Sequence, residues 1–81
     1  MMSELNLFKL NLGKRIAFLR EQRGLTQAQL GSFINKDFQS ISRVENGRTG
    51  ISAFALKQLA DALSVTMNEI VDFTEIRSNN K

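Results

Sequence analysis

The 81-residue sequence contains no cysteine, no histidine and no proline. The absence of cysteine and histidine excludes disulfides, zinc fingers and histidine-based catalysis. Carboxylate-based metal binding stays open, but the acidic residues form no metal-binding motif. Neither a nucleophile–base pair nor a glycine-rich phosphate loop is present. We therefore expect no cofactor, no metal and no enzymatic activity.

Long hydrophobic runs are also missing. No apolar stretch approaches the roughly 20 residues of a membrane-spanning helix, and no basic and apolar leader precedes a cleavage site. We expect a cytoplasmic protein with no membrane partner. A length of 81 residues suits one small domain covering residues 1–81. The lack of proline permits long helices, so a single all-α domain is the simplest architecture.

Apolar residues recur at helical spacing near the N-terminus and predict a helix from about Asn6 to Gln22. Its core-facing stripe contains Leu5, Phe8, Leu12, Ile16 and Leu19. If this helix is continuous, three apolar residues on its opposite side should be exposed: Leu7, Leu10 and Phe18. An extended conformation for residues 5–10 remains an alternative, because the leucines there also alternate.

Two short helices joined by a tight turn follow. Thr26 and Gln29 have the spacing of a capping box, which begins a helix from about Thr26 to Ile34. Leu30 and Ile34 share one face of that helix. Asn35 tolerates the left-handed conformation that a turn requires at this point.

The second helix of the pair is capped by Asp37 and ends at Gly47. Ile41 and Val44 point to one side of it. Polar side chains lie on the opposite side, within roughly 100° of one another at 3.6 residues per turn: Gln39, Ser42, Arg43 and Asn46. This arrangement is typical of a helix-turn-helix that reads the major groove of double-stranded DNA.

Two further helices complete the predicted domain. Ser52 caps a fourth helix, whose apolar positions follow the helical repeat: Leu56, Leu59, Ala60 and Leu63. Thr66 and Glu69 form another capping box and open a fifth helix. Its apolar residues are Met67, Ile70, Val71 and Phe73. The polar tail at residues 78–81 should be frayed.

Charge is distributed unevenly along the chain. Residues 1–48 contain eight Lys or Arg against four Asp or Glu, a balance of +4, whereas residues 49–81 contain three against four, a balance of −1. Composition alone favours a solvated surface for the basic half. Because the helix-turn-helix lies in that half, the charge indicates a face that binds phosphates.

The run from Leu12 to Ile70 resembles the Cro/C1-repressor (Xre-like) helix-turn-helix family of small bacterial and phage regulators. The matching pieces are Arg-Ile-x-x-Leu-Arg at 15–20, Thr-Gln at 26–27, Ile-Ser-Arg-Val-Glu-Asn-Gly at 41–47 and Leu-x-x-Leu-Ala-x-Ala-Leu at 56–63. The resemblance implies a five-helix, lambda-repressor-like fold with the helix-turn-helix at helices 2 and 3. The departures weaken local packing or turns but change no functional position: Gly31 for alanine, Asn35 and Ser64 for glycine, and Gly50-Ile51 for Asn-Pro.

Gln39 and Arg43 are the leading base readers, because an amide can form two hydrogen bonds with adenine and a guanidinium two with guanine. Gln27, beside a helix N-terminus, suits a phosphate contact, and the resemblance favours this role. Lys36 either contacts the DNA backbone or is a solubilising charge. Phe38 either touches a thymine methyl or folds back over the core, and we favour partial packing. The other candidates are expected at phosphates or water: Ser40, Ser42, Asn46, Arg48 and Thr49.

Arg20 and Glu45 occupy faces that otherwise point inward. Since a lone buried charge is costly, we expect them to form an ion pair between the first helix and the recognition helix, as in the family that the chain resembles. Apolar residues near the C-terminus exceed what a small domain easily buries. Val71, Phe73 and Ile76 therefore predict a homodimer interface in segment 66–77, with the fifth helix favoured over the first as the main contact.

These features predict a nucleoid-associated, sequence-specific transcriptional regulator whose homodimer places two recognition helices on a pseudo-palindromic operator. A repressor is favoured, because no further domain remains to sense a ligand or to display an activating surface. A restriction-modification controller is one specific form. The alternative is an antitoxin that binds a toxin or another protein partner and autoregulates its operon. A protein-interaction module that has lost DNA binding is disfavoured by Gln27, Gln39, Arg43 and Arg48.

Overall fold

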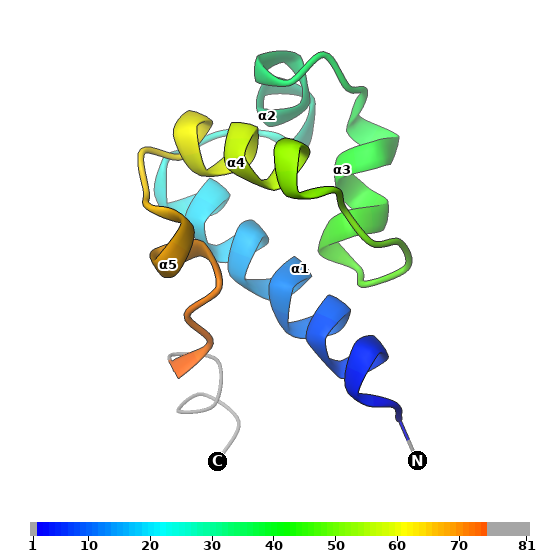
Figure 1. Cartoon of the computed structure of the whole chain (residues 1–81). Coiled ribbons are helices and arrows are strands. Elements are labelled where there is room, and N and C mark those ends of the chain that lie inside the picture. Colours follow the sequence, from blue (N-terminus) through cyan, green and yellow to red (C-terminus); the bar gives the residue numbers. More distant parts are fainter. Residues whose placement is uncertain (1, 75–81) are drawn as a thin grey trace.

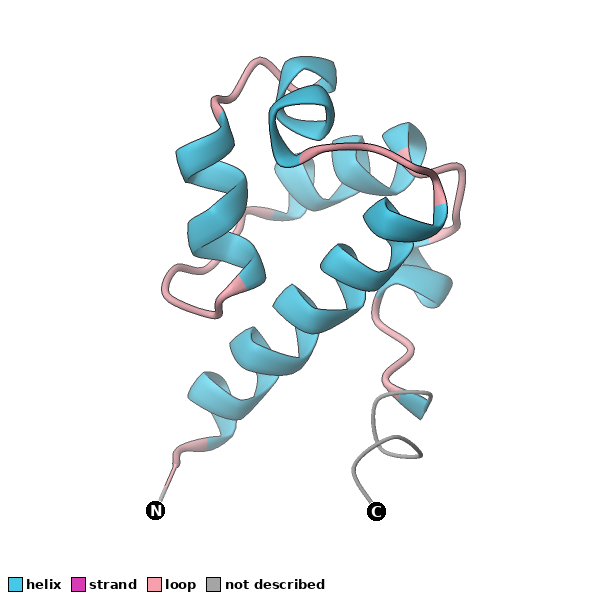
Figure 2. Cartoon of the chain, turned by 180° about the vertical axis from the view of Figure 1, so that it is seen from behind, coloured by secondary structure: helices cyan, strands magenta, loops and turns pink. Residues whose placement is uncertain are grey.

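The computed structural model describes residues 2–74 and folds them into five helices. In chain order these are α1 (Glu4–Gln22), α2 (Gln27–Phe33), α3 (Phe38–Glu45), α4 (Ala53–Ala62) and α5 (Met67–Ile70). Figure 1 shows α3 and α5 at opposite flanks of the molecule, with α1 running between them, and the view from behind in Figure 2 agrees. No strand occurs among residues 2–74. The predicted all-α, five-helix architecture is confirmed.

Each helix begins at a side chain that caps its N-terminus. The cap oxygen accepts a hydrogen bond from the backbone N–H three residues later, which satisfies one of the free N–H groups of the first turn. The caps are Ser3, Thr26, Asp37, Ser52 and Thr66. Both predicted capping boxes are complete. Ser3 was missed, and α1 consequently begins two residues earlier than expected.

Two of the acidic side chains at these caps make the stability of the fold depend on pH. The backbone N–H of Ser40 lowers the pKa of Asp37 below its ordinary value, and the backbone N–H of Thr66 does the same for Glu69. A carboxylate with a lowered pKa in the folded state stabilises the fold above its unfolded pKa. That contribution is lost as the pH falls through the lowered folded value.

We therefore expect the melting temperature to fall as the pH drops below about 4. The double variant Asp37→Asn with Glu69→Gln keeps side chains that can cap a helix but cannot titrate, so its melting temperature should fall less over the same pH range. Thermal melts by circular dichroism between neutral and acid pH make the comparison. An equal acid-induced fall in both proteins would mean that these two carboxylates do not set the pH dependence.

The hydrophobic core takes apolar side chains from all five helices. Each apolar position predicted for the fourth helix is buried, as is the shared face of the helix before the turn. The complete set is Leu12, Ile16, Leu19, Leu30, Ile34, Ile41, Val44, Leu56, Leu59, Ala60, Leu63 and Ile70. The core therefore connects the helix-turn-helix to α1 and α4, so that α2 and α3 are held as one rigid unit.

The N-terminal turns of α1 project beyond this core (Figure 1). Leu5 and Phe8, which periodicity placed in the core-facing stripe, are exposed because the shorter helices do not extend over them. Phe18, expected to be exposed, is half-buried against the core. Residues 5–10 are helical, so the extended alternative is wrong. Although α1 has 19 residues, no helix in the described part of the chain is long and apolar enough to cross a membrane.

Backbones approach closely where α3 meets its neighbours. A Cβ atom at Gly13 of α1 would collide with the carbonyl oxygens of Val44 and Glu45 in α3. A Cβ atom at Gly31 of α2 would lie 2.5 Å from the carbonyl oxygen of Lys36. Glycine at position 31 was expected to weaken packing, but here it permits the close contact between α2 and the turn.

The C-terminal part of the described chain differs from the prediction. The helix α5 ends at Ile70, so Phe73 lies beyond it. Phe73 is half-buried, and its ring packs edge to face on Phe8 of α1 with the centroids 5.6 Å apart. Val71 remains 38% exposed. The predictions for Ile76 and for the frayed tail lie outside the described residues.

Candidate DNA interface

The connection between α2 and α3 is a tight turn. Asn35 adopts the expected left-handed conformation, with φ 59°, and Ser64 has the same φ at the other position where the family usually has glycine. The backbone N–H of Lys36 donates to the carbonyl oxygen of Gly31 at 2.8 Å and closes the turn. Asp37 then caps α3. The predicted helix-turn-helix is therefore present at α2 and α3.

The recognition helix α3 has one buried face and one exposed face. Ile41, Val44 and Glu45 are buried against the rest of the domain. Gln39 and Arg43, the predicted base readers, are exposed on the opposite side. The structure thus leaves an amide and a guanidinium free of the core and adjacent on one helix surface.

Shorter polar side chains lie beside these two residues. Ser40 and Ser42 are half-buried. The side-chain nitrogen of Asn46 donates to the carbonyl oxygen of Ser42 at 2.8 Å and to its hydroxyl at 3.3 Å, which holds Asn46 over the last turn of α3. Arg48 and Thr49 follow the helix and are exposed.

Arg20 and Glu45 form the predicted ion pair. Nε of Arg20 donates to Oε2 of Glu45 at 2.7 Å, Nη2 donates to Oε1 at 3.1 Å, and Nη1 donates to the carbonyl oxygen of Leu25 at 2.7 Å. The two side chains are only 13% and 6% exposed. The hydrogen bond with Glu45 raises the pKa of Arg20 above its ordinary value. The pair ties α1 to the C-terminal end of α3.

Gln27 joins this ion pair. Its Nε2 donates to Oε1 of Glu45 at 2.9 Å, so the first residue of α2 is fixed to the last residue of α3. No sequence pattern predicts this contact, because the two residues are 18 apart. A primary amide nitrogen carries two N–H groups, so Gln27 retains one donor beyond its bond to Glu45.

Phe38 does not pack as expected. Its side chain is 54% exposed and lies outside the core and outside the set of half-buried apolar residues that contact the core. The preference for partial packing was wrong because Ile41 and Val44 already fill the buried side of α3. Phe38 therefore stands at the beginning of the recognition helix as an exposed aromatic ring.

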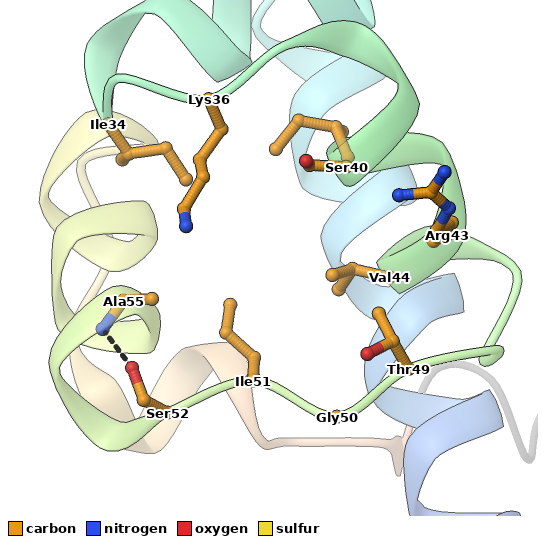
Figure 3. A pocket seen from close by; sticks show the side chains of 11 residues that line it. Ile34, Lys36, Ser40, Arg43, Val44, Thr49, Gly50, Ile51, Ser52 and Ala55 are labelled. Atoms are coloured by element: carbon orange, nitrogen blue, oxygen red, sulfur yellow. Dashed lines mark hydrogen bonds between the residues drawn. The ribbon is translucent and has the colours of Figure 1, made fainter.

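An open cavity of about 380 Å³ lies between the α2–α3 turn, α3 and the loop that leads to α4 (Figure 3). Lys36 extends across it from the turn, and Ile51 points into it from the loop. Ser40, Arg43 and Thr49 also contribute to its lining. None of the lining residues, all within residues 2–74, is acidic. Two cations beside several hydroxyl groups suit an anionic group such as a DNA phosphate.

Three of the eight basic residues in positions 1–48 serve the fold. Arg15 donates from Nε to the carbonyl oxygen of Glu69 at 3.0 Å, and Arg23 donates from Nε to that of Leu63 at 2.8 Å. Arg20 is committed to its ion pair. Fewer basic residues are therefore available to bind phosphates than the charge count of residues 1–48 indicated. The five other basic residues are Lys9, Lys14, Lys36, Arg43 and Arg48, and the last three border or belong to α3.

Comparison with known proteins identifies curated relatives. The competence pilus inhibition repressor from Acinetobacter baylyi is 34% identical over 70 residues, which cover 86% of this chain and 64% of that protein. The repressor RghR from Bacillus subtilis is 39% identical over 56 residues, covering 68% of this chain and 42% of that protein. An uncharacterised regulator, y4dJ of Sinorhizobium fredii, is 34% identical over 64 residues, covering 79% of this chain and 83% of that protein. The chain thus spans about half the length of the first two relatives.

Solved structures share the fold. The restriction-modification controller protein C.AhdI from Aeromonas hydrophila superposes with a TM-score of 0.79 at 26% identity, covering 84% of this chain and 99% of that chain. The hypothetical transcription factor NHTF from Neisseria superposes with a TM-score of 0.80 at 20% identity, covering 100% of this chain and 93% of that chain. A family model described as helix-turn-helix matches residues 16–70. The chain therefore belongs to the Cro/C1-type, Xre-like helix-turn-helix family of transcriptional regulators.

Proposed function

We propose that the protein is a sequence-specific transcriptional repressor that binds a pseudo-palindromic operator as a homodimer. The observation that carries this proposal is the exposed face of α3, where Gln39 and Arg43 lie adjacent and Lys36 and Arg48 stand nearby. The buried ion pair of Glu45 fixes the orientation of that helix. A rigid helix with a polar and basic outer face fits the major groove of DNA. The repressor names of the relatives from A. baylyi and B. subtilis support the sign of regulation.

Within this interface we assign two kinds of contact. Gln39 and Arg43 read base edges, because each offers paired hydrogen-bonding groups that match one purine. Gln27 binds a phosphate with the amide N–H that Glu45 leaves available. The remaining polar residues contact phosphates directly or through water: Lys36, Ser40, Ser42, Asn46, Arg48 and Thr49.

Selection of bound duplexes from a random DNA pool tests the function directly. The pool reports whether the protein binds DNA, which half-site it prefers and how far apart two half-sites lie. We expect an inverted repeat whose half-sites are about one helical turn apart, since two recognition helices of a dimer then meet the same side of the duplex. A pool that returns no enriched sequence would contradict the proposal.

Arg43→Ala and Gln27→Ala should weaken DNA binding in different ways. Loss of Arg43 should cost about 1 to 3 kcal/mol on the selected operator and relax base preference at one position of each half-site. Loss of Gln27 should weaken binding to operator and to scrambled DNA by similar factors, because phosphates carry no sequence information. Gel shifts of both variants on both duplexes provide the measurement.

Lys57→Ala is the matched control for charge. It removes one positive charge from the exposed side of α4, where Lys57 pairs with Asp61. The affinities for operator DNA and for scrambled DNA should both stay nearly unchanged. Equal losses for Arg43→Ala on operator and on scrambled DNA would remove Arg43 from the base-reading role.

Regulation of transcription is favoured over an antitoxin function. The curated relatives carry the names of repressors and regulators, so the proposal requires neither a toxin partner nor a catalytic step. In this role the protein acts on the chromosome, in the nucleoid of the cytoplasm.

A further inference from the structure

The recognition helix begins with an exposed residue that has no hydrogen-bonding group. Phe38 is the first residue of α3, and 54% of its side chain is exposed. Among residues 2–74 the aromatic and cation–π contacts are those of Phe8 with Phe73 and of Arg15 with Phe18, so Phe38 takes part in neither. Within residues 2–74 the ring of Phe38 therefore has neither an aromatic nor a cation–π partner.

The position of Phe38 favours contact with bases over contact with phosphates. It lies one turn before Ser42 on the helix surface and directly precedes Gln39, so it continues the exposed face of α3 toward the helix N-terminus. N-terminal residues of a recognition helix are the ones that reach base edges in the major groove. The carboxylate of Asp37 accepts the Ser40 backbone N–H at 2.9 Å, so this N–H group of the first turn of α3 is not available to a phosphate.

The chemistry of the ring then restricts what it can recognise. A phenylalanine side chain neither donates nor accepts a conventional hydrogen bond, so the donors and acceptors of guanine, cytosine and adenine offer it no favourable contact. The C5-methyl of thymine is the apolar group in the major groove, and phenylalanine is one of the residues that contacts it. From these observations we propose that Phe38 is a specificity-determining residue that reads a thymine methyl in each half-site, an inference that rests on the proposed DNA-binding function.

Removing one methyl group from such a contact should weaken binding by about fourfold per half-site. Uracil differs from thymine only by lacking this methyl. Replacing the selected thymine by deoxyuridine in both half-sites should therefore raise the Kd of the wild-type protein by roughly fifteenfold if the half-sites contribute independently. The Kd of Phe38→Ala should not change on the same replacement, because the variant has no ring to contact the methyl.

The experiment uses two random DNA pools, one synthesised with thymidine and one with deoxyuridine in its place. We expect the wild-type protein to enrich thymine at one position of each half-site in the first pool and to show no preference there in the second. Phe38→Ala should show no preference at that position in either pool. Phe38→Leu retains an apolar side chain and should keep part of the thymine preference. Circular dichroism checks that each variant remains helical.

Phe54→Ala is the matched control, because Phe54 is 72% exposed but lies on α4 and not on the recognition helix. Its selected sequences should equal those of the wild type. Retention of the thymine preference by Phe38→Ala would overturn the thymine-reading role of Phe38, as would equal wild-type affinity for thymine and deoxyuridine operators. Either result would leave the proposed DNA-binding function standing. Failure of the wild type to enrich any sequence would instead contradict the proposed function and, with it, this inference.

Discussion

Replacing Glu45 with alanine is expected to lower the free energy of unfolding by about 3 to 4 kcal/mol. Glu45 is the acceptor for Arg20 and for Gln27, and its loss leaves the Arg20 guanidinium, only 13% exposed, without its main partner. Breaking a buried pair on one side costs about 3 to 5 kcal/mol. The remaining hydrogen bond from Arg20 to Leu25 keeps the expected effect near the lower end. Small domains are stabilised by about 5 to 15 kcal/mol, so this loss is a large share.

A double-mutant cycle measured by urea unfolding tests this prediction. Arg20→Met combined with Glu45→Leu removes both charges together, and should recover much of the stability lost in Glu45→Ala. Glu21→Ala is the control, because Glu21 lies 3.8 Å from Arg20 but is 71% exposed, and should change stability by less than about 1 kcal/mol. If the effects of the single changes at Arg20 and Glu45 were additive, the two residues would not stabilise each other.

Local sequence patterns predicted the helices and the turn well, because the forces that set them are local. A cap such as Thr26 or Ser52 bonds to an N–H three residues away, and this spacing is visible in the sequence. The left-handed turn at Asn35 depends on the residue itself. The exposure of Gln39 and Arg43 followed from the 3.6-residue repeat of the helix that carries them.

Contacts between distant residues could not be read in the same way. The bond from Gln27 to Glu45 and the close passage of Gly13 beside α3 depend on how helices cross. Arg15 and Arg23 counted as basic surface in the sequence, whereas in the fold they donate to carbonyl oxygens near the ends of α4 and α5. The ion pair of Arg20 with Glu45 was predicted despite their separation in the sequence. An isolated buried charge is costly, so each of the two residues needs a partner of opposite charge wherever that partner lies in the chain.

Which apolar side chains stay exposed could not be fully predicted from the sequence. Periodicity predicts which side of a helix is apolar, but not how far neighbouring helices cover it. Leu5 and Phe8 continue the buried stripe of α1 onto turns that the other helices leave uncovered. Phe73 lies beside Phe8, and Val71 follows directly after α5. Val71 is therefore at the α5 side of the molecule, which Figure 1 shows at the flank opposite α3, whereas Leu5 and Phe8 line a cavity together with Val44 of α3.

A second copy of the chain bound at Val71, beside α5, would leave both recognition helices available for DNA. This geometry supports the proposed homodimer through Val71 and Phe73, with Ile76 as the third interface residue of the proposal. A single recognition helix reads only a few base pairs, so one half-site alone binds weakly. Linking two copies makes the second contact effectively intramolecular and can strengthen binding by 100- to 10,000-fold.

We therefore expect Val71→Glu to produce a folded monomer whose affinity for the complete operator is lower by about 100- to 10,000-fold, while its affinity for an isolated half-site is unchanged. Val71 is the suitable position, because it is 38% exposed, whereas Phe73 packs on Phe8 and a charge there would disturb the fold itself. Sedimentation at tens of micromolar, gel shifts on the two duplexes and circular dichroism measure assembly, binding and folding separately. Phe54→Glu places the same charge on an exposed aromatic position of α4 and should remain dimeric. If the wild type sediments as a monomer and still binds one half-site tightly, dimerisation cannot be the source of operator affinity, and the exposed apolar residues need another explanation, such as contact with a toxin or another protein partner.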